Sequence, residues 1–316
     1  MRPGVAQLAS RFRTLVALAS SLLWLAACSS TPPDIRYRPA ESVLEVVTLL
    51  RLHRDDDTYR FAPARDYTGK NVYRAALDRL DSLEALYSDK FSTGYLRSEI
   101  QFAKGIALER ITEYELAAQH FERAAELDSE LARDADEAAQ ICNRLLRASE
   151  VILSPDVPMS EVLSYFDAQT RELEELLSDV GVSYHSPVVR EEIERSDLRR
   201  AHYADARRRL DPRLSAFALQ QYQLLLHKHA ESKNRNRHLI ALADLYSSLS
   251  RQYAAGNPPV SLRFDPATFD EYAYSASRLY EAVSQQDGAI EKIEASRKLE
   301  AFLAFTLEVH EQKIPR

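Results

Sequence analysis

Glycine is scarce in this chain, with seven residues in 316. After residue 27 no two glycines lie close together. Phosphate-binding P-loops, Gly-x-Gly-x-x-Gly dinucleotide turns and Gly-x-Ser-x-Gly nucleophile elbows each need clustered glycines, so these three kinds of site are excluded. No Asn-Gly or Asp-Gly turn lies between alternating apolar runs either, since Asp287-Gly288 stands between two helical patterns. The sequence therefore argues against β-hairpins.

Metal-binding motifs are absent as well. The chain has two cysteines, Cys28 and Cys142, and neither a Cys-x-x-Cys nor a His-Glu-x-x-His motif. His227 and His229 would point apart on a helix, because two positions differ by about 200°. His238 would approach them across a turn, but the lysines and arginines around these histidines repel a cation. We expect surface histidines and no metal site.

Long apolar runs and positive charge are also missing. After residue 27 no stretch reaches the roughly 18 apolar residues that would span a bilayer. The chain has 41 basic and 48 acidic side chains and a net charge of −7. The first 27 residues contain arginines and no acidic residue, so the remainder is more acidic still. An acidic surface gains nothing at nucleic-acid phosphates, and we expect no nucleic-acid partner.

The beginning of the chain has the pattern of an export signal. A basic start is provided by Arg2, Arg11 and Arg13. An apolar run over 15–27 follows, too short for a comfortable membrane span, and it ends in small residues directly before Cys28. A charged start, a short apolar core and a small-residue end predict that residues 1–27 are a signal peptide.

The last residues of that segment, Leu25-Ala26-Ala27-Cys28, resemble the lipobox of a bacterial lipoprotein. The resemblance implies cleavage before Cys28 and acyl chains on its sulfur and its new amino group, with no other cofactor. Ser29 stands where an aspartate would imply retention, so the resemblance also implies an outer-membrane protein facing the periplasm. Residues 28–40 would form the lipidated cysteine and a flexible tether. Cys142 is then the single remaining thiol, and we expect it in the core.

Proline placement and apolar spacing predict helices throughout the body. Ser186-Pro187, Asp211-Pro212 and Asp265-Pro266 each place a good N-cap before a proline. Between such marks apolar residues recur with a period near 3.6. We predict an all-α fold with an N-terminal repeat region over 41–153 and a C-terminal region over 154–316. The eleven expected helices cover 41–53, 70–88, 94–111, 113–128, 130–153, 160–180, 187–210, 212–230, 233–254, 266–285 and 288–311.

Residues 98–131 resemble a tetratricopeptide repeat. A small residue stands on the first helix of the unit, and small and aromatic residues follow on the second at the repeat's spacing. These positions are Gly105, Tyr114, Ala117, Phe121 and Ala124. The resemblance implies a solenoid of antiparallel helix hairpins, in which small residues let helices lie about 8–9 Å apart. Gln101 and Ser129 depart from the repeat, and an irregular bundle with one embedded repeat stays open.

The charged helix expected over 187–210 allows two interpretations. Its arginines and carboxylates often stand four residues apart, which is typical of a solvated face with weak ion pairs. Alternatively, Arg207, Arg208 and Arg209 form a basic patch that binds an acidic partner or a lipid headgroup.

Together these features predict a binding protein and not an enzyme. We expect a membrane-anchored scaffold in envelope assembly or secretion, whose helical grooves bind a segment of another envelope protein. The alternative is a periplasmic accessory lipoprotein that binds a small molecule in a cavity between the helices. An enzyme would need a converging cluster of polar side chains, which no linear motif supplies.

Overall fold

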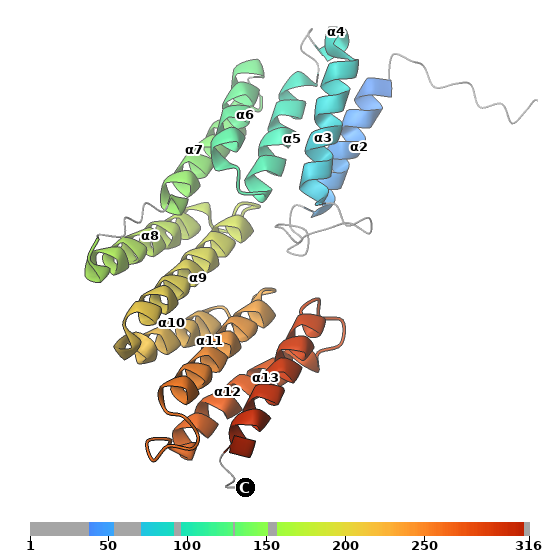
Figure 1. Cartoon of the computed structure of the whole chain (residues 1–316). Helices are drawn as coiled ribbons and strands as arrows, with labels where there is room; N and C mark the ends of the chain where they lie inside the picture. The colour runs from blue at the N-terminus through green and yellow to red at the C-terminus, as the bar shows by residue number, and fades with distance from the viewer. Residues whose placement is uncertain (1–37, 54–70, 92–95, 129, 151–156, 313–316) are drawn as a thin grey trace, which may run out of the picture.

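The computed structural model describes residues 38–53, 71–91, 96–128, 130–150 and 157–312 (Figure 1). Within these ranges the chain is helical and forms no β-strand, which confirms the predicted all-α class. None of the helices in these ranges has the length and hydrophobicity needed to span a bilayer. The helices are α2 (Arg38–His53), α3 (Val72–Leu86), α4 (Ser88–Phe91), α5 (Arg97–Arg110), α6 (Tyr114–Leu127), α7 (Ala132–Ser149), α8 (Met159–Val180), α9 (Ser186–Leu210), the 3-10 turn η2 (Pro212–Leu214), α10 (Ser215–Lys228), α11 (Arg235–Gly256), α12 (Pro266–Ser284) and α13 (Lys292–Gln312).

Each predicted helix overlaps an observed one, and the differences lie at the ends. The single helix expected over 70–88 is wrong, because α3 stops at Leu86 and the short helix α4 follows. There the N–H of Tyr87 bonds to the carbonyl of Leu83 and caps α3. Residues 38–40, expected in the tether, form the first turn of α2. Residues 1–37, with the signal peptide and Cys28, lie outside the described residues.

The three expected Xaa-Pro helix starts have different outcomes. At Asp265 the prediction is confirmed, because its carboxylate accepts hydrogen bonds from the backbone N–H groups of Ala267 and Thr268. Asp211 accepts one such bond, from Arg213, and caps the 3-10 turn η2, after which α10 begins at Ser215. At Ser186 the prediction is wrong. Ser186 is already the first helical residue of α9, and its hydroxyl accepts a hydrogen bond from the N–H of Ser183. This bond shapes the tight turn between α8 and α9.

The positions that define the expected repeat are packed together at α5 and α6. A Cβ atom at Gly105 would lie 2.6 Å from Cε1 of Phe121, so a glycine is required for this approach of α5 to α6. Phe121 is fully buried, and so are Ala117 and Ala124. Tyr114 is buried at the start of α6. Small residues therefore set the distance between these helices, and the phenylalanine ring fills the space.

The hydrophobic core is a series of clusters along an elongated molecule. Helices that follow each other in sequence pack side by side, as Figure 1 shows from α2 to α13. The clusters join α2 to α5, α5 to α7, α6 to α9, α9 to α11 and α11 to α13. The third includes Leu145 of α7 and Leu173 of α8, so a core bridges the boundary expected near residue 153. Neighbouring helices along this series therefore stabilise one another.

Candidate functional site

The three arginines expected to form a basic patch do not share one surface. Arg208 is 1% exposed and links α9 to α11. Its guanidinium donates to Asp205 on its own helix, and to Gln252 and Ser248 on α11, at 2.9, 2.9 and 3.2 Å. Arg209 is exposed and pairs with the same aspartate at 2.8 Å. The patch prediction is therefore wrong for Arg208, because helix packing buries the middle of the three side chains.

The histidines are placed differently from the prediction as well. His227 is exposed, as expected, but His238 is 2% exposed. Its Nε2 lies 2.5 Å from Oε1 of Glu194, which also accepts a hydrogen bond from the Ser232 hydroxyl at 2.6 Å. Similarly, Nε2 of His229 lies 2.8 Å from Oδ2 of Asp197. Carboxylates of α9 thus hold the turn between α10 and α11.

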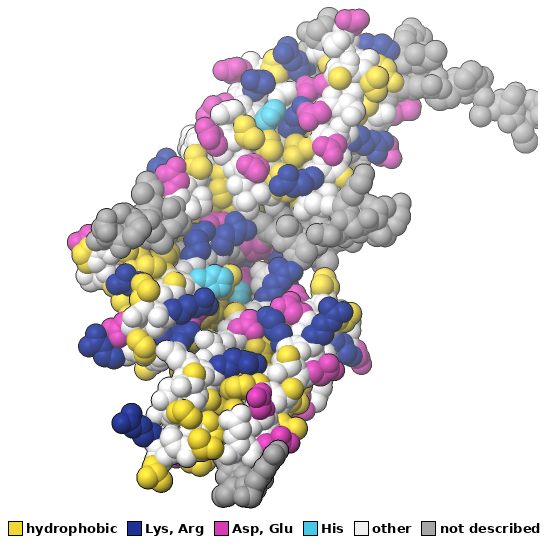
Figure 2. Space-filling model, in the orientation of Figure 1, with side chains coloured by type: hydrophobic (Ala, Val, Ile, Leu, Met, Phe, Trp, Pro, Cys, Tyr) yellow, Lys and Arg dark blue, Asp and Glu magenta, His cyan; other side chains and the backbone are white. Residues whose placement is uncertain are grey.

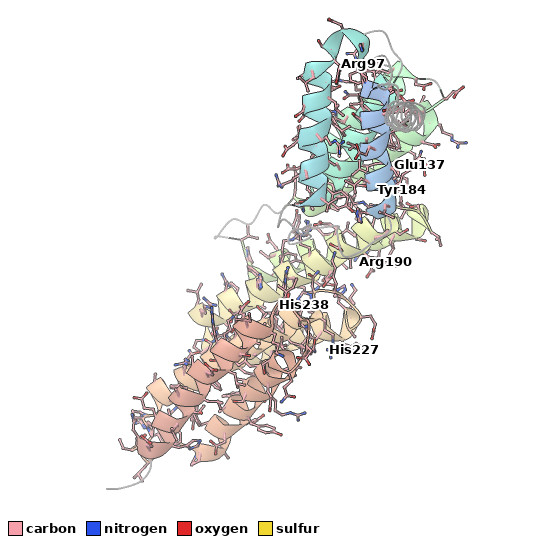
Figure 3. All side chains as sticks on the ribbon, turned by 90° about the vertical axis from the view of Figure 1, so that its right-hand side faces the viewer. Arg97, Glu137, Tyr184, Arg190, His227 and His238 are labelled. Carbon is pink, nitrogen blue, oxygen red and sulfur yellow. The ribbon has the colours of Figure 1, made fainter. Side chains whose placement is uncertain are left out.

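This cluster lies at the middle of the molecule. Figure 2 shows histidines there among interspersed basic and acidic side chains, and Figure 3 places His238 beside α9. Each carboxylate has a histidine and another donor, so the groups satisfy one another. No set of three potential ligands in the described residues is arranged to hold a metal ion. The cluster is therefore a structural joint between α9 and the helices that follow it.

A second buried polar cluster joins α5 and α6 to the turn before α9. Glu109 is completely buried, and its Oε1 lies 2.5 Å from Nδ1 of His185. The adjacent Arg110, also buried, donates to the backbone carbonyl of Tyr184 at 2.6 Å. The Tyr184 ring lies tilted on the His185 ring, with 3.9 Å between their centroids. These contacts fix the turn firmly against the end of α5.

The hydroxyl of Tyr114 continues this cluster toward α9. It donates to Oε2 of the fully buried Glu192 at 3.0 Å. Arg195 and Arg199 also bind this carboxylate, at 2.8 and 3.1 Å. Burial, followed by the charge of Glu192, raises the pKa of Tyr114 well above its ordinary value, so the phenol stays a hydrogen-bond donor.

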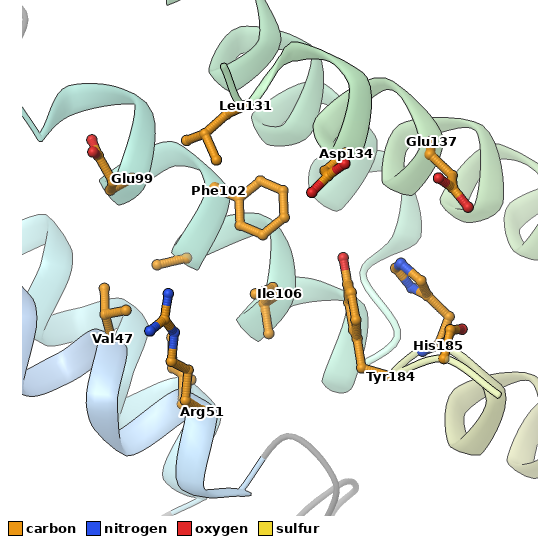
Figure 4. A pocket seen from close by; sticks show the side chains of 13 residues that line it. Val47, Arg51, Glu99, Phe102, Ile106, Leu131, Asp134, Glu137, Tyr184 and His185 are labelled. Atoms are coloured by element: carbon orange, nitrogen blue, oxygen red, sulfur yellow. Dashed lines mark hydrogen bonds between the residues drawn. The ribbon is translucent and has the colours of Figure 1, made fainter. Parts of the chain in front are cut away.

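Beside the Glu109–His185 pair, a cavity of about 430 Å³ opens between α2, α5, α7 and the turn before α9 (Figure 4). We call it the α2–α5–α7 cavity. The described residues that line it form an apolar floor and a polar rim. The floor is made by Val47, Leu50, Phe102, Ala103, Ile106 and Leu131. The rim is made by Arg51, Glu99, Asp134, Glu137, Ser183, Tyr184 and His185.

The rim is predominantly acidic. Three carboxylates, on Glu99, Asp134 and Glu137, stand against one guanidinium. Asp134 pairs with the neighbouring Arg133 at 3.1 Å, but both side chains are exposed and such pairs are weak. Figure 3 places Glu137 and Tyr184 close together, where the first helices meet α9. The cavity thus combines an apolar floor with net negative charge at its rim.

His185 gives the cavity wall one directed polar group. Glu109 holds its Nδ1, and Figure 4 shows the ring pointing into the space between Tyr184 and Glu137. Its Nε2 makes no hydrogen bond to any described residue. The two partners are 76 positions apart, so no linear motif could reveal this pair. Only the folding of the chain brings Glu109 and His185 together.

Cys142 lies in the hydrophobic core, as predicted. Cys142 is fully buried among side chains of α5, α6 and α7. Burial raises its pKa well above the ordinary value, which keeps it protonated and unreactive. It does not line the α2–α5–α7 cavity.

No family model and no curated protein matches this chain.

Proposed function

We propose that this chain is a lipid-anchored scaffold of the bacterial envelope that binds a segment of a partner protein. Acylated Cys28 would hold it to the outer membrane, and the helical body would face the periplasm. The observation that carries the binding role is the α2–α5–α7 cavity, whose apolar floor lies open beneath a polar rim. Apolar pockets with a few directed polar groups are the usual form of a binding site.

The tetratricopeptide-like arrangement of the body belongs to this proposal. It is supported by the close approach of Gly105 to Phe121 and by the packing of successive helices on one another. In such arrays each helix pair contributes to a continuous surface, and grooves along it hold extended or helical segments of partners. The cavity is built by three helices of this kind and by the turn before α9.

A binding role accounts for the cavity better than a catalytic one. An enzyme of this kind would need an activated nucleophile or a metal beside the histidine. The single described cysteine is buried elsewhere, and Ser183 has its hydroxyl engaged by the N–H of His185 at 3.3 Å. Glu109 and His185 instead act as a fixed support for the cavity wall.

Photocrosslinking in intact cells tests the proposal. A photoreactive amino acid placed at Glu137, on the cavity rim, is expected to give a discrete adduct with one envelope protein. The same residue at Glu122, exposed on α6 and away from the cavity, is the matched control. Cys28→Ser tests the anchor, because it is expected to remove the lipid and weaken the adduct by lowering the local concentration. Equal adducts at both positions, or adducts with lipid alone, would count against a scaffold.

A small-molecule ligand is the second candidate function. The cavity volume of about 430 Å³ falls within the range of small-ligand pockets, roughly 300–1,000 Å³. A thermal-shift screen against a metabolite library distinguishes the two roles. A strong stabilisation that Phe102→Asp abolishes would favour the small molecule over the protein segment.

A further inference from the structure

We infer that the α2–α5–α7 cavity recognises a segment in which a large apolar side chain stands next to a lysine or arginine. This inference rests on the proposed scaffold function and specifies the chemistry of its partner. The apolar side chain would enter the floor of the cavity, and the cation would lie among the rim carboxylates.

The floor is suited to one rigid apolar anchor. Phe102 is partly buried, and its ring packs edge-on against Phe121, with 5.2 Å between the centroids and 67° between the planes. Phe121 is in turn locked against Gly105. Phe102 therefore presents a fixed aromatic surface to the cavity, as Figure 4 shows. A leucine, methionine or phenylalanine of a partner would bury its apolar surface there without rearranging the helices.

The rim selects the charge beside that anchor. Its three carboxylates come from two helices, Glu99 from α5 and Asp134 and Glu137 from α7, and they outnumber the one guanidinium, that of Arg51 from α2. Glu137 forms no ion pair with a described residue. A cation at the rim is attracted by more charges than repel it, because three carboxylates stand against one guanidinium. An acidic peptide or an anionic headgroup would be repelled by the same groups.

His185 adds a hydrogen bond of defined direction. The buried carboxylate of Glu109 holds one ring nitrogen, which leaves Nε2 for the occupant. A backbone group of an entering segment would bond to it, and this would orient the segment across the cavity. Lipid chains offer no such group, whereas every peptide unit does.

Peptide-library selection tests the inference on the full mature chain, lipidated and held in lipid nanodiscs. A random peptide library is selected against the wild-type chain, with empty nanodiscs used to subtract lipid binders. The enriched peptides are expected to carry leucine, methionine or an aromatic residue beside lysine or arginine. Synthetic copies of these peptides are then measured for affinity by fluorescence anisotropy.

Two charge-reversal variants with the same change in net charge complete the experiment. Glu99→Lys, Asp134→Lys and Glu137→Lys together reverse the rim. Glu115→Lys, Glu122→Lys and Glu126→Lys together reverse exposed positions on α6, none of which lines the cavity. The rim variant is expected to weaken binding of the selected peptides at least about tenfold, and the α6 variant to leave it within about twofold. Circular dichroism confirms that both variants keep the helical fold.

Several outcomes would overturn the inference. One is enrichment of acidic or uncharged peptides, another is equal loss in both variants, and a third is no enrichment over empty nanodiscs. These outcomes are separate from failure of the scaffold function. If the Glu137 crosslink still captures a partner, the scaffold stands and only the proposed chemistry falls. If selected peptides bind but no partner is captured in cells, the cavity has this preference and the scaffold role is wrong.

Discussion

Single residues in this chain decide how closely its helices approach. Gly105 is the clearest case, because a β-carbon there would overlap the ring of Phe121. Alanine is intrinsically better than glycine in a helix, by about 1 kcal/mol. The fully buried ring has no room to move away, however, so the clash outweighs that gain.

We therefore expect Gly105→Ala to lower the free energy of unfolding by about 1–3 kcal/mol, measured by urea denaturation followed by circular dichroism. Gly256→Ala is the matched control, since an added Cβ there would meet no atom within 4 Å. It should be neutral or slightly stabilising. A Gly105→Ala chain as stable as the wild type would show that α5 and α6 separate without cost.

Arg208 was expected on the surface as part of a basic patch, but the structure buries it. The Arg208 side chain is buried and its guanidinium donates hydrogen bonds to Asp205, Gln252 and Ser248, so its removal breaks the link from α9 to α11 and leaves a cavity between these helices. We expect Arg208→Ala to destabilise the fold by about 2–4 kcal/mol.

Arg209→Ala provides the comparison, because Arg209 binds the same aspartate from an exposed position. It should cost less than about 1 kcal/mol. Urea denaturation of both variants measures the difference. Equal effects would mean that Arg208 contributes no more than a surface ion pair.

Elements are joined in this molecule by buried polar contacts as well as by apolar packing. At the joint between α9 and α10–α11, burial raises the pKa values of Glu194 and Asp197, but their bonded partners lower them more. Hydrogen bonds from His238 and Ser232 act on Glu194, and His229 with Lys228 acts on Asp197. Both pKa values end below their ordinary 4.5 and 3.8.

The direction of the pH dependence follows from these lowered pKa values. In acid the unfolded chain takes up protons on these carboxylates before the folded chain does. The stabilisation is therefore complete above about pH 5 and is lost as the pH falls further. We expect Glu194→Gln with Asp197→Asn to flatten the fall in unfolding free energy between about pH 5 and 3. Glu122→Gln with Asp136→Asn, both exposed, serves as the control. An unchanged slope in the first variant would mean that the joint does not contribute to acid sensitivity.

The sequence predicted the helices better than it predicted any other feature of the structure. Proline at helix starts, scarce glycine and the 3.6-residue period predicted every long helix to within a few residues, because these are local properties. The charged face of α9 was misread for the same reason. Its glutamates stand in a pattern typical of solvent exposure, yet Glu191, Glu192 and Glu194 are buried. Their partners from outside α9 are Lys233, Tyr114 and His238, respectively.

The candidate site could not be predicted from the sequence. Its lining residues come from three helices and one turn, and none of them forms a linear motif. Glu109 and His185 are brought together only by the packing of the α8–α9 turn on α5. Apolar spacing does mark Phe102 and Ile106 as helix residues, but it does not show that part of their surface faces an empty space.

The whole molecule is a linear series of small cores, and this arrangement predicts how it loses structure. Each core is shared by adjacent helices. A substitution that destabilises one core therefore destabilises the helices that share it, and it has less effect on helices farther along the series. Two fully buried phenylalanines allow a direct comparison. Phe302 lies on the terminal helix α13, and Phe121 lies on α6 in the interior of the series.

Both Phe302→Ala and Phe121→Ala remove a large ring from a closed core and are expected to cost about 3–5 kcal/mol locally. Native-state amide hydrogen exchange reports where that cost is felt. Phe302→Ala should lower protection in α12 and α13 and leave α5 and α6 unchanged, because those helices share no core with α13. Phe121→Ala should lower protection on both sides of α6, from α5 to α7. If Phe302→Ala instead lowers protection equally in every helix, the chain unfolds as one cooperative unit, and a partner bound in the α2–α5–α7 cavity would stabilise α13 as strongly as α5.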